Sequence, residues 1–297
     1  MEEKKKKGFI KRHWSTLLLF GILIVGAFLL IYPSASDYYN SFRQSMAIAV
    51  YDEEAMKLSE EEKQAVIDEA REWNKYLNTL VDRWVLSDSD MERYMSILDI
   101  TGTGIMGYVN IPVANISLPI YHTTEDKYLT KAAGHIENTS FPVGGESTHS
   151  AISGHRGLPA AKLFTDLDRV NVGDLFQITV LTENFTYEVD KISIVEPEDT
   201  SLLEIEDGSD YCTLITCTPY AVNTHRLLIR GHRVSNYLFD KETIPGDATK
   251  YEAVYIAPLV AIPILAVLAI ILLITTRKPK NKAEKKGRDE NEDEKQD

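Results

Sequence analysis

The cysteine at position 217 is better placed than any other residue of this chain to act as a nucleophile. It ends the run Thr213-Leu-Ile-Thr-Cys217, whose β-branched and aliphatic residues are typical of a strand, and Pro219 follows soon after. Arg226 stands nine residues after Cys217, at the start of a second strand-like run. If the two runs pair, a permanently charged guanidinium returns beside the thiol. The pattern therefore predicts a cysteine nucleophile with a fixed cation next to it.

A cysteine nucleophile needs a nearby base or a positive charge, and His155 has the most suitable context of the seven histidines. It follows an apolar run and is flanked by Gly154 and Gly157, on a loop whose backbone can approach another segment closely. His149 lies inside a strand pattern and is expected to be structural. The residues alone leave an alternative open, in which Cys217 is a small core residue and His155 a surface group.

The chain has only two cysteines, and we expect them not to bond to each other. Cys212 and Cys217 are five residues apart, so in a strand they face opposite sides, about 16 Å apart. A disulfide requires Cα atoms within about 7 Å. Free cysteine in an exported domain suggests a functional role.

Two long uncharged runs, 14–32 and 253–276, are each long enough to cross a bilayer core of about 30 Å as a helix. Basic residues in 1–13 and in the charged tail 277–297 predict that both termini are cytoplasmic and that 33–252 lies outside the cell. A cleaved signal peptide is the alternative for the first run, but its length favours an uncleaved anchor. The net charge of −13 argues against nucleic acid as a partner.

Between the two runs, the chain divides into a helical part, 33–104, a strand-rich part, 105–236, and a short linker, 237–252. Ser59 with Glu62 is a capping box, and apolar residues at helical spacing follow it. The segment from Asp88 to Gly107 is polar and predicts a loop. Many short strands predict a mainly β fold with a closed barrel; they are expected at 105–111, 117–121, 147–153, 175–181, 185–195, 211–217 and 226–234.

In combination, these motifs resemble the sortase family, the cysteine transpeptidases of Gram-positive cell envelopes. The run ending at Cys217 is similar to the family's TLxTC signature, Arg226 matches its arginine, and Ser-Gly-His155 matches its histidine segment. The resemblance extends over 105–234. Details resemble class C, the pilus-assembling sortases: CTPY at Cys217, GHRGLP around His155, AKLFTDLD at 161–168, RGHR at 230–233, the helical extension and the second span.

The resemblance implies a membrane enzyme that cleaves an LPxTG-like signal between Thr and Gly and transfers the acyl group to an amine. Cys217 would be the nucleophile, His155 the acid and base, and Arg226 the oxyanion or substrate contact. Thr216 is a further candidate for an oxyanion or substrate contact. In class C the acceptor is a pilin lysine; the alternatives are a cell-wall cross-bridge amine or, outside enzymology, a membrane-tethered binding domain. No cofactor or metal is implied.

Class C sortases carry a lid with an Asp-Pro-aromatic motif, whose aspartate pairs with the catalytic arginine. We expect the corresponding loop here at Asp88 and Asp90, where the proline and the adjacent aromatic residue are missing. Some sortases bind calcium through an acidic loop like 196–210. That segment has no EF-hand spacing, so we expect a solvated loop.

Overall fold

The structure is a computed structural model, and it describes residues 2–242 and 262–271. The described residues fall into two compact units, 2–34 together with 262–271, and 35–242. The helices are α1 (Glu2–Lys57), α2 (Glu60–Leu77), α3 (Asp88–Ser96), α4 (Asp126–Leu129), α5 (Asn236–Glu242) and an apolar helix at Ile262–Ile271. The strands are β1 (Ile105–Ile111), β2 (Ile116–His122), β3 (Ala133–His135), β4 (Thr148–Ser153), β5 (Leu175–Val180), β6 (Glu183–Val195), β7 (Asp210–Thr218) and β8 (His225–Val234).

The helix α1 is continuous and contains Pro33. Among the described residues it is the one helix long and apolar enough to cross a membrane, and its candidate span begins at Leu17. This agrees with the first predicted span. For the second, only the apolar helix Ile262–Ile271 is described, and the rest of 253–276 lies outside the described residues. The two-span arrangement therefore stays a prediction.

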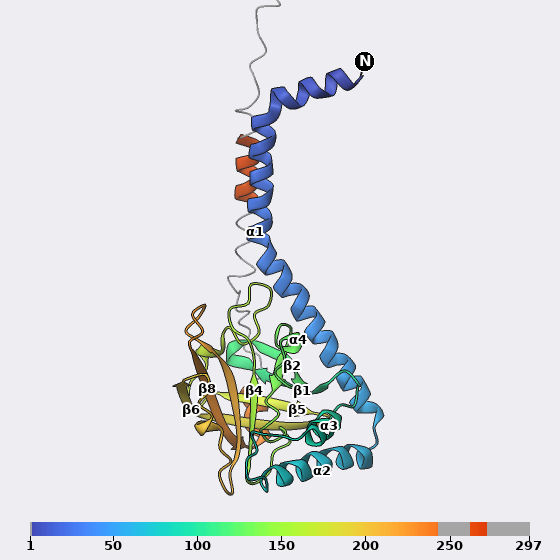
Figure 1. The fold of residues 1–297 in the computed structure, drawn as a ribbon, viewed down its shortest axis with the longest axis vertical. Helices are drawn as coiled ribbons and strands as arrows, with labels where there is room; N and C mark the ends of the chain where they lie inside the picture. Colours follow the sequence, from blue (N-terminus) through green and yellow to red (C-terminus); the bar gives the residue numbers. More distant parts are fainter. Residues whose placement is uncertain (1, 243–261, 272–297) are drawn as a thin grey trace, which may run out of the picture. The chain divides into compact units, whose positions relative to one another are not determined.

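The eight strands form a closed barrel in the order β1-β2-β3-β4-β7-β8-β6-β5. Most of these strands are labelled in Figure 1. All seven strands expected from the sequence are present, most within one or two residues of the predicted bounds. The strand that was not predicted is β3, whose three residues are too few for alternation to be visible. It pairs in parallel with β2 and antiparallel with β4, and so closes this side of the barrel.

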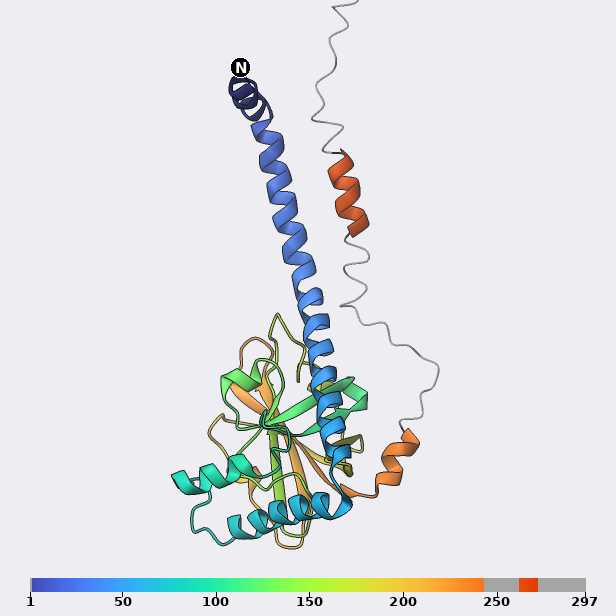
Figure 2. The same cartoon turned by 90° about the vertical axis from the view of Figure 1, so that its right-hand side faces the viewer.

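The prediction of a loop from Asp88 to Gly107 is wrong for its first half, which forms the helix α3. Ser87 and Asp90 form a capping box, in which each side chain accepts from the other residue's backbone N–H. The predicted capping box of Ser59 and Glu62 at the start of α2 is confirmed. The two helices pack together at one end of the barrel (Figures 1 and 2), where Trp73 of α2 contacts Tyr94 of α3.

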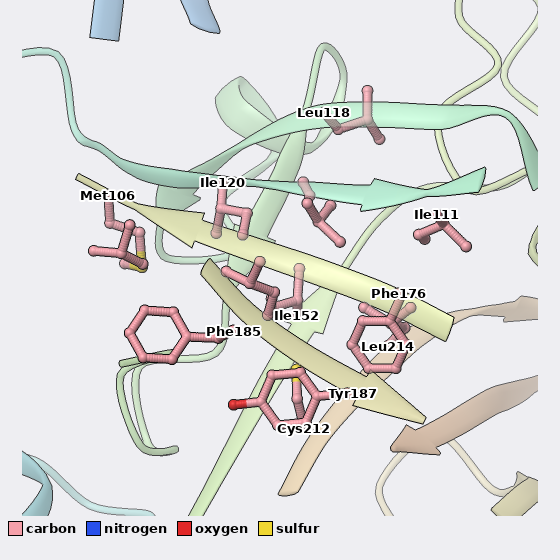
Figure 3. Close-up of a cluster of buried hydrophobic side chains, with 14 of the residues drawn as sticks. Met106, Ile111, Leu118, Ile120, Ile152, Phe176, Phe185, Tyr187, Cys212 and Leu214 are labelled. Atoms are coloured by element: carbon pink, nitrogen blue, oxygen red, sulfur yellow. The ribbon is translucent and has the colours of Figure 1, made fainter. Parts of the chain in front are cut away.

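The barrel interior is filled by alternate residues of the strands, among them Ile120, Ile152, Phe176, Cys212 and Leu214 (Figure 3). Such alternation assigns every other residue of a strand to the interior and the remainder to the outer face. A second, smaller cluster lies on the outer face and comprises Ala151, Leu203, Ile215 and Leu228. The strand β7 contributes alternate residues to the two clusters. This alternation determines which of its side chains face outward, where a substrate can reach them.

Candidate active site

Cys217 and Arg226 are direct partners in the antiparallel ladder of β7 and β8. Leu214 belongs to the interior cluster and Ile215 to the outer one, so Cys217 continues the outer face of β7. Cys217 and Arg226 are both partly exposed. Directly opposed side chains of an antiparallel pair lie about 5 Å apart at their Cβ atoms. The predicted pairing of the two strand runs, which sets Arg226 opposite Cys217, is therefore present.

The Arg226 guanidinium has no acidic partner among the described residues. Its Nη1 donates to the carbonyl of His225 (3.2 Å) and, weakly, to that of Asn223 (3.5 Å). Arg230, on the same strand face, differs: it donates to both carboxylate oxygens of Asp190 (3.0 and 2.9 Å) and to Glu206 (3.2 Å). Arg226 is thus a cation left available for a ligand, whereas Arg230 is committed to structure.

His155 reaches the same level of the barrel because β4 and β7 are parallel neighbours, with Ser153 opposite Ile215. Beyond the strand end, the Gly154 N–H donates to the carbonyl of Ile215 (3.0 Å). A Cβ on Gly154 would lie 2.7 Å from the Phe164 ring, so only glycine fits. His155 follows directly, and the same register continued by two residues would set it opposite Cys217.

The Thr216 side chain does not accompany Cys217 to the outer face. It is 1% exposed, and its hydroxyl donates to the carbonyl of Gly154 (2.8 Å). A substrate contact by this side chain is therefore not supported. The hydroxyl instead joins β7 to the residue before His155, which holds the histidine and cysteine segments in register.

The two cysteines have opposite environments, and both are free thiols, as predicted. Cys212 is fully buried in the barrel, and this burial raises the pKa of its thiol well above the ordinary value. It therefore remains a protonated core residue at neutral pH. Cys217 is the cysteine that a substrate can approach.

His149 is structural, as predicted. It is 1% exposed, and burial lowers the pKa of its imidazole to about 4, so the ring is neutral at physiological pH. Its Nδ1–H donates to the carbonyl of Glu204 (2.8 Å), and its Nε2 accepts from the Thr213 hydroxyl (2.7 Å). His149 thereby holds the segment between β6 and β7 against the outer face of the barrel.

The segment between α2 and α3 makes contacts with the barrel that were not predicted from the sequence. Trp84 packs against the outer cluster that includes Ile215, two residues before Cys217. The Asp82 carboxylate accepts from the Trp84 N–H (3.0 Å). Asp82-Arg83-Trp84 thus has the aspartate and the aromatic residue of the lid motif, with arginine in place of proline. The sequence contains an aspartate and a tryptophan two residues apart between two helices, which could have indicated this segment. It was not recognised because the proline of the motif is missing.

Arg83 fastens this segment to the barrel. It is 8% exposed and donates to the carbonyls of Asn138 (3.0 Å) and Leu203 (2.8 Å), with Glu204 at 3.4 Å. Asn138 donates in return to the Arg83 carbonyl (2.9 Å). The guanidinium carbon also lies 4.6 Å from the centre of the Trp84 ring.

The aspartates predicted for the lid lie elsewhere. Asp90 accepts from the Ser87 hydroxyl (2.6 Å) and from the Tyr76 hydroxyl (3.0 Å), both part of the junction between α2 and α3. Asp88 stands in the first turn of α3. Asn74 and Asn78 attach α2 near the beginning of β4, whereas His155 follows its end. No contact joins either aspartate to Arg226 in the described part of the chain. The described residues contain no cluster of three or more His, Cys, Asp or Glu side chains suited to a metal ion.

Comparison with known proteins identifies the family. Residues 109–234 match the family model of the sortase domain. Sortase D of Bacillus subtilis is 30% identical over 132 residues, which are 43% of this chain and 64% of that protein, so the chain matches less than two thirds of this relative. Sortase C1 of Streptococcus agalactiae is 48% identical, with a TM-score of 0.63, over 64% of this chain and 99% of that structure.

Two further solved structures are similar. Sortase C of Streptococcus pneumoniae, described with respect to pilin substrate specificity, is 39% identical with a TM-score of 0.58, over 64% of this chain and 97% of that one. Sortase C-1 of Actinomyces oris is 41% identical with a TM-score of 0.54, over 58% and 99%. With the barrel and the cysteine–arginine pair in place, these matches show that the chain belongs to the sortase family of cysteine transpeptidases, among the class C sortases.

Proposed function

We propose that this chain is a membrane-anchored transpeptidase that cleaves an LPxTG-like sorting signal and joins the released acyl group to a lysine amine of a pilin. The observation that carries the proposal is the direct pairing of Cys217 with Arg226, a cation that has no acidic partner among the described residues. His155 is held at the same level by the parallel register of β4 and β7.

In the first step, the Cys217 sulfur attacks the carbonyl carbon of the signal's threonine. The oxyanion that forms lies beside the Arg226 guanidinium, whose charge is permanent at any physiological pH. His155 donates a proton to the departing glycine amine, and the C–N bond breaks. The products are a thioester on Cys217 and the free C-terminal peptide.

In the second step, a lysine amine of another protein attacks the thioester carbon. His155 accepts the proton that the amine loses, and the C–S bond breaks to release the Cys217 thiolate. The amide that forms replaces the amide that was cleaved. No nucleotide hydrolysis is needed, because the thioester stores the energy of the first bond.

The membrane assignment is supported by α1, whose apolar part is long enough to span a bilayer. We propose the two-pass topology predicted from the basic flanks, with 33–252 on the extracellular face and both termini in the cytoplasm. The barrel would then lie beside precursors that pause in the same membrane. Confinement of both partners to one surface raises their effective concentration.

The pilin acceptor is supported by the resemblance to solved class C structures, because the match extends over nearly the whole length of those structures. The test uses the full chain in membranes with a pilin that carries an LPxTG-like signal. High-molecular-weight ladders are expected, and they should disappear when the pilin's acceptor lysine is changed to arginine. Ladders that persist in this variant, or products that require a cell-wall cross-bridge amine, would instead identify a wall-anchoring sortase.

The segment Asp82–Trp84 is proposed as the lid of this enzyme. The proposal is supported by the packing of Trp84 on the outer cluster that includes Ile215, which lies on the same strand face as Cys217. The lid differs from the Asp-Pro-aromatic form in two respects. Its aspartate bonds to its own segment (Trp84 N–H), and its arginine fastens it to the loops before β4 and β7.

Arg83→Ala is expected to accelerate acylation of Cys217 by an LPxTG-like peptide by about tenfold, because the lost bonds to carbonyls contribute on the order of 1.5 kcal/mol or more to the closed position. The measurement is the rate of thioester formation by mass spectrometry on the full chain. Arg71→Ala is the matched control, since Arg71 pairs with Asp68 on the exposed face of α2. An acylation rate equal to that of the control would exclude a closing role for Arg83.

A further inference from the structure

Three of the segments that resemble class C meet at one guanidinium, that of Arg156, the residue directly after His155. The Arg156 Nη2 forms an ion pair with Asp168, at the end of the AKLFTDLD segment. The guanidinium carbon also lies 5.8 Å from the centre of the Tyr220 ring, in the CTPY segment that begins with Cys217. Arg156 therefore touches residues attached to both sides of the active site.

The contacts of Arg156 matter for its stability in this position because its side chain is largely buried. The Arg156 side chain is 8% exposed, whereas that of Asp168 is 49% exposed. Removal of a charge from water is costly unless a counter-charge and an aromatic face replace the hydration. Asp168 and Tyr220 supply these replacements, while the buried Nε of Arg156 has no hydrogen-bond partner among the described residues, so loss of either partner leaves the cation still less compensated. The guanidinium is held where both partners can reach it.

The two active-site loops also touch directly at Gly157. This residue has φ +76°, and a Cβ placed on it would lie 3.2 Å from the Tyr220 ring. Only glycine adopts this conformation readily and leaves space for the ring. The loop after β4 thus packs against the loop after β7, and Arg156 fixes the contact.

The remainder of the loop after β4 is anchored on its other side. Its backbone donates from Phe164 to the His155 carbonyl (3.0 Å) and from Lys162 to the Asp37 carboxylate of α1 (2.8 Å). Asn40 of α1 donates to the Ala160 carbonyl (2.7 Å). These bonds hold the main chain of the loop, while Arg156 provides its side-chain connection to the segment of Cys217.

We propose that Arg156 is a positioning residue that sets His155 against Cys217, acting through Asp168 and Tyr220. It does not contact the substrate; it connects the histidine loop to the cysteine loop, so that proton transfer occurs at the correct distance. This inference rests on the proposed acyl transfer. It predicts that the proton-transfer step is sensitive to the three residues, whereas peptide binding is not.

The test compares Arg156→Gln, Asp168→Asn, Tyr220→Ala and Tyr220→Phe with the wild-type full chain. For acylation by an LPxTG-like peptide, kcat is expected to fall by about 10- to 100-fold in the first three variants, the scale of a misplacement near 1 Å, with KM unchanged. Tyr220→Phe keeps the ring and should remain near wild type. Asp168→Asn and Tyr220→Ala keep Arg156 itself, so they remain informative if Arg156→Gln does not fold.

A second readout, alkylation of Cys217 by iodoacetamide at neutral pH, requires no sorting signal. The same three variants are expected to react several-fold more slowly. Arg169→Ala is the control, because this exposed arginine neighbours Asp168 and pairs with Asp166. If all variants match the control in both readouts, the positioning role is wrong. If wild type forms no thioester but the variants still change alkylation, the proposed function fails while the positioning role stands.

Discussion

Replacement of Cys217 by alanine is expected to abolish thioester formation with an LPxTG-like peptide. The thiol lies on the outer face, paired with Arg226 across the ladder, and the structure offers no second accessible thiol among its described residues. Loss of a covalent nucleophile reduces turnover on the order of 10⁴-fold or more. Mass spectrometry of the full chain after incubation with the peptide measures the effect, because the acyl adduct appears as a mass increase.

Cys212→Ala is the matched control for this experiment. Cys212 lies in the same strand but faces the interior, so its loss costs packing, about 1 kcal/mol of the free energy of unfolding, and leaves acylation intact. An adduct that survives in Cys217→Ala and is lost in Cys212→Ala would reverse the assignment. Absence of any adduct in the wild type and in Arg83→Ala would favour a non-catalytic binding domain.

Arg226→Lys is expected to lower kcat/KM for acylation by about 10²- to 10³-fold, as found when one donor to an oxyanion is removed. Lysine keeps the charge but lacks the planar fork of donors, and its ammonium sits on a flexible stem. The guanidinium is available for this role because its bonds in the described structure go only to the carbonyls of its own turn. Steady-state kinetics with a peptide substrate measures the change.

Arg230→Ala separates this effect from a general loss of charge on β8. Arg230 is bound by Asp190 and Glu206, so its removal should lower the free energy of unfolding by about 1–2 kcal/mol and leave kcat/KM within a few-fold of wild type. If both variants lose activity equally, the effect is not specific to the arginine opposite Cys217, and the proposed role of Arg226 is wrong. If Arg226→Lys keeps wild-type kinetics, the fixed geometry of the guanidinium is not needed.

The family and most of the barrel were predictable from the sequence, which also supplied the candidate site residues. Cys217, Arg226 and His155 each stand at the end or beginning of a strand whose alternation is readable locally, and the motif spacing supplied the family. The strand β3 was not predictable, because three residues held by partners on both sides carry no pattern of their own. The helix α3 was not predicted, because the polar residues of its capping box were interpreted as part of a loop.

Tertiary structure decided how these residues are arranged. It turned the Thr216 hydroxyl inward, packed Trp84 against the outer cluster that includes Ile215, and brought Arg156 between Asp168 and Tyr220. The sequence by itself determined which side chains can do the chemistry, since those depend on residue type and local alternation. Arg156 meets Asp168 within the connection between β4 and β5, whereas Tyr220 is 64 residues further along the chain. The second contact depends on the parallel pairing of β4 and β7, which is a property of the tertiary structure.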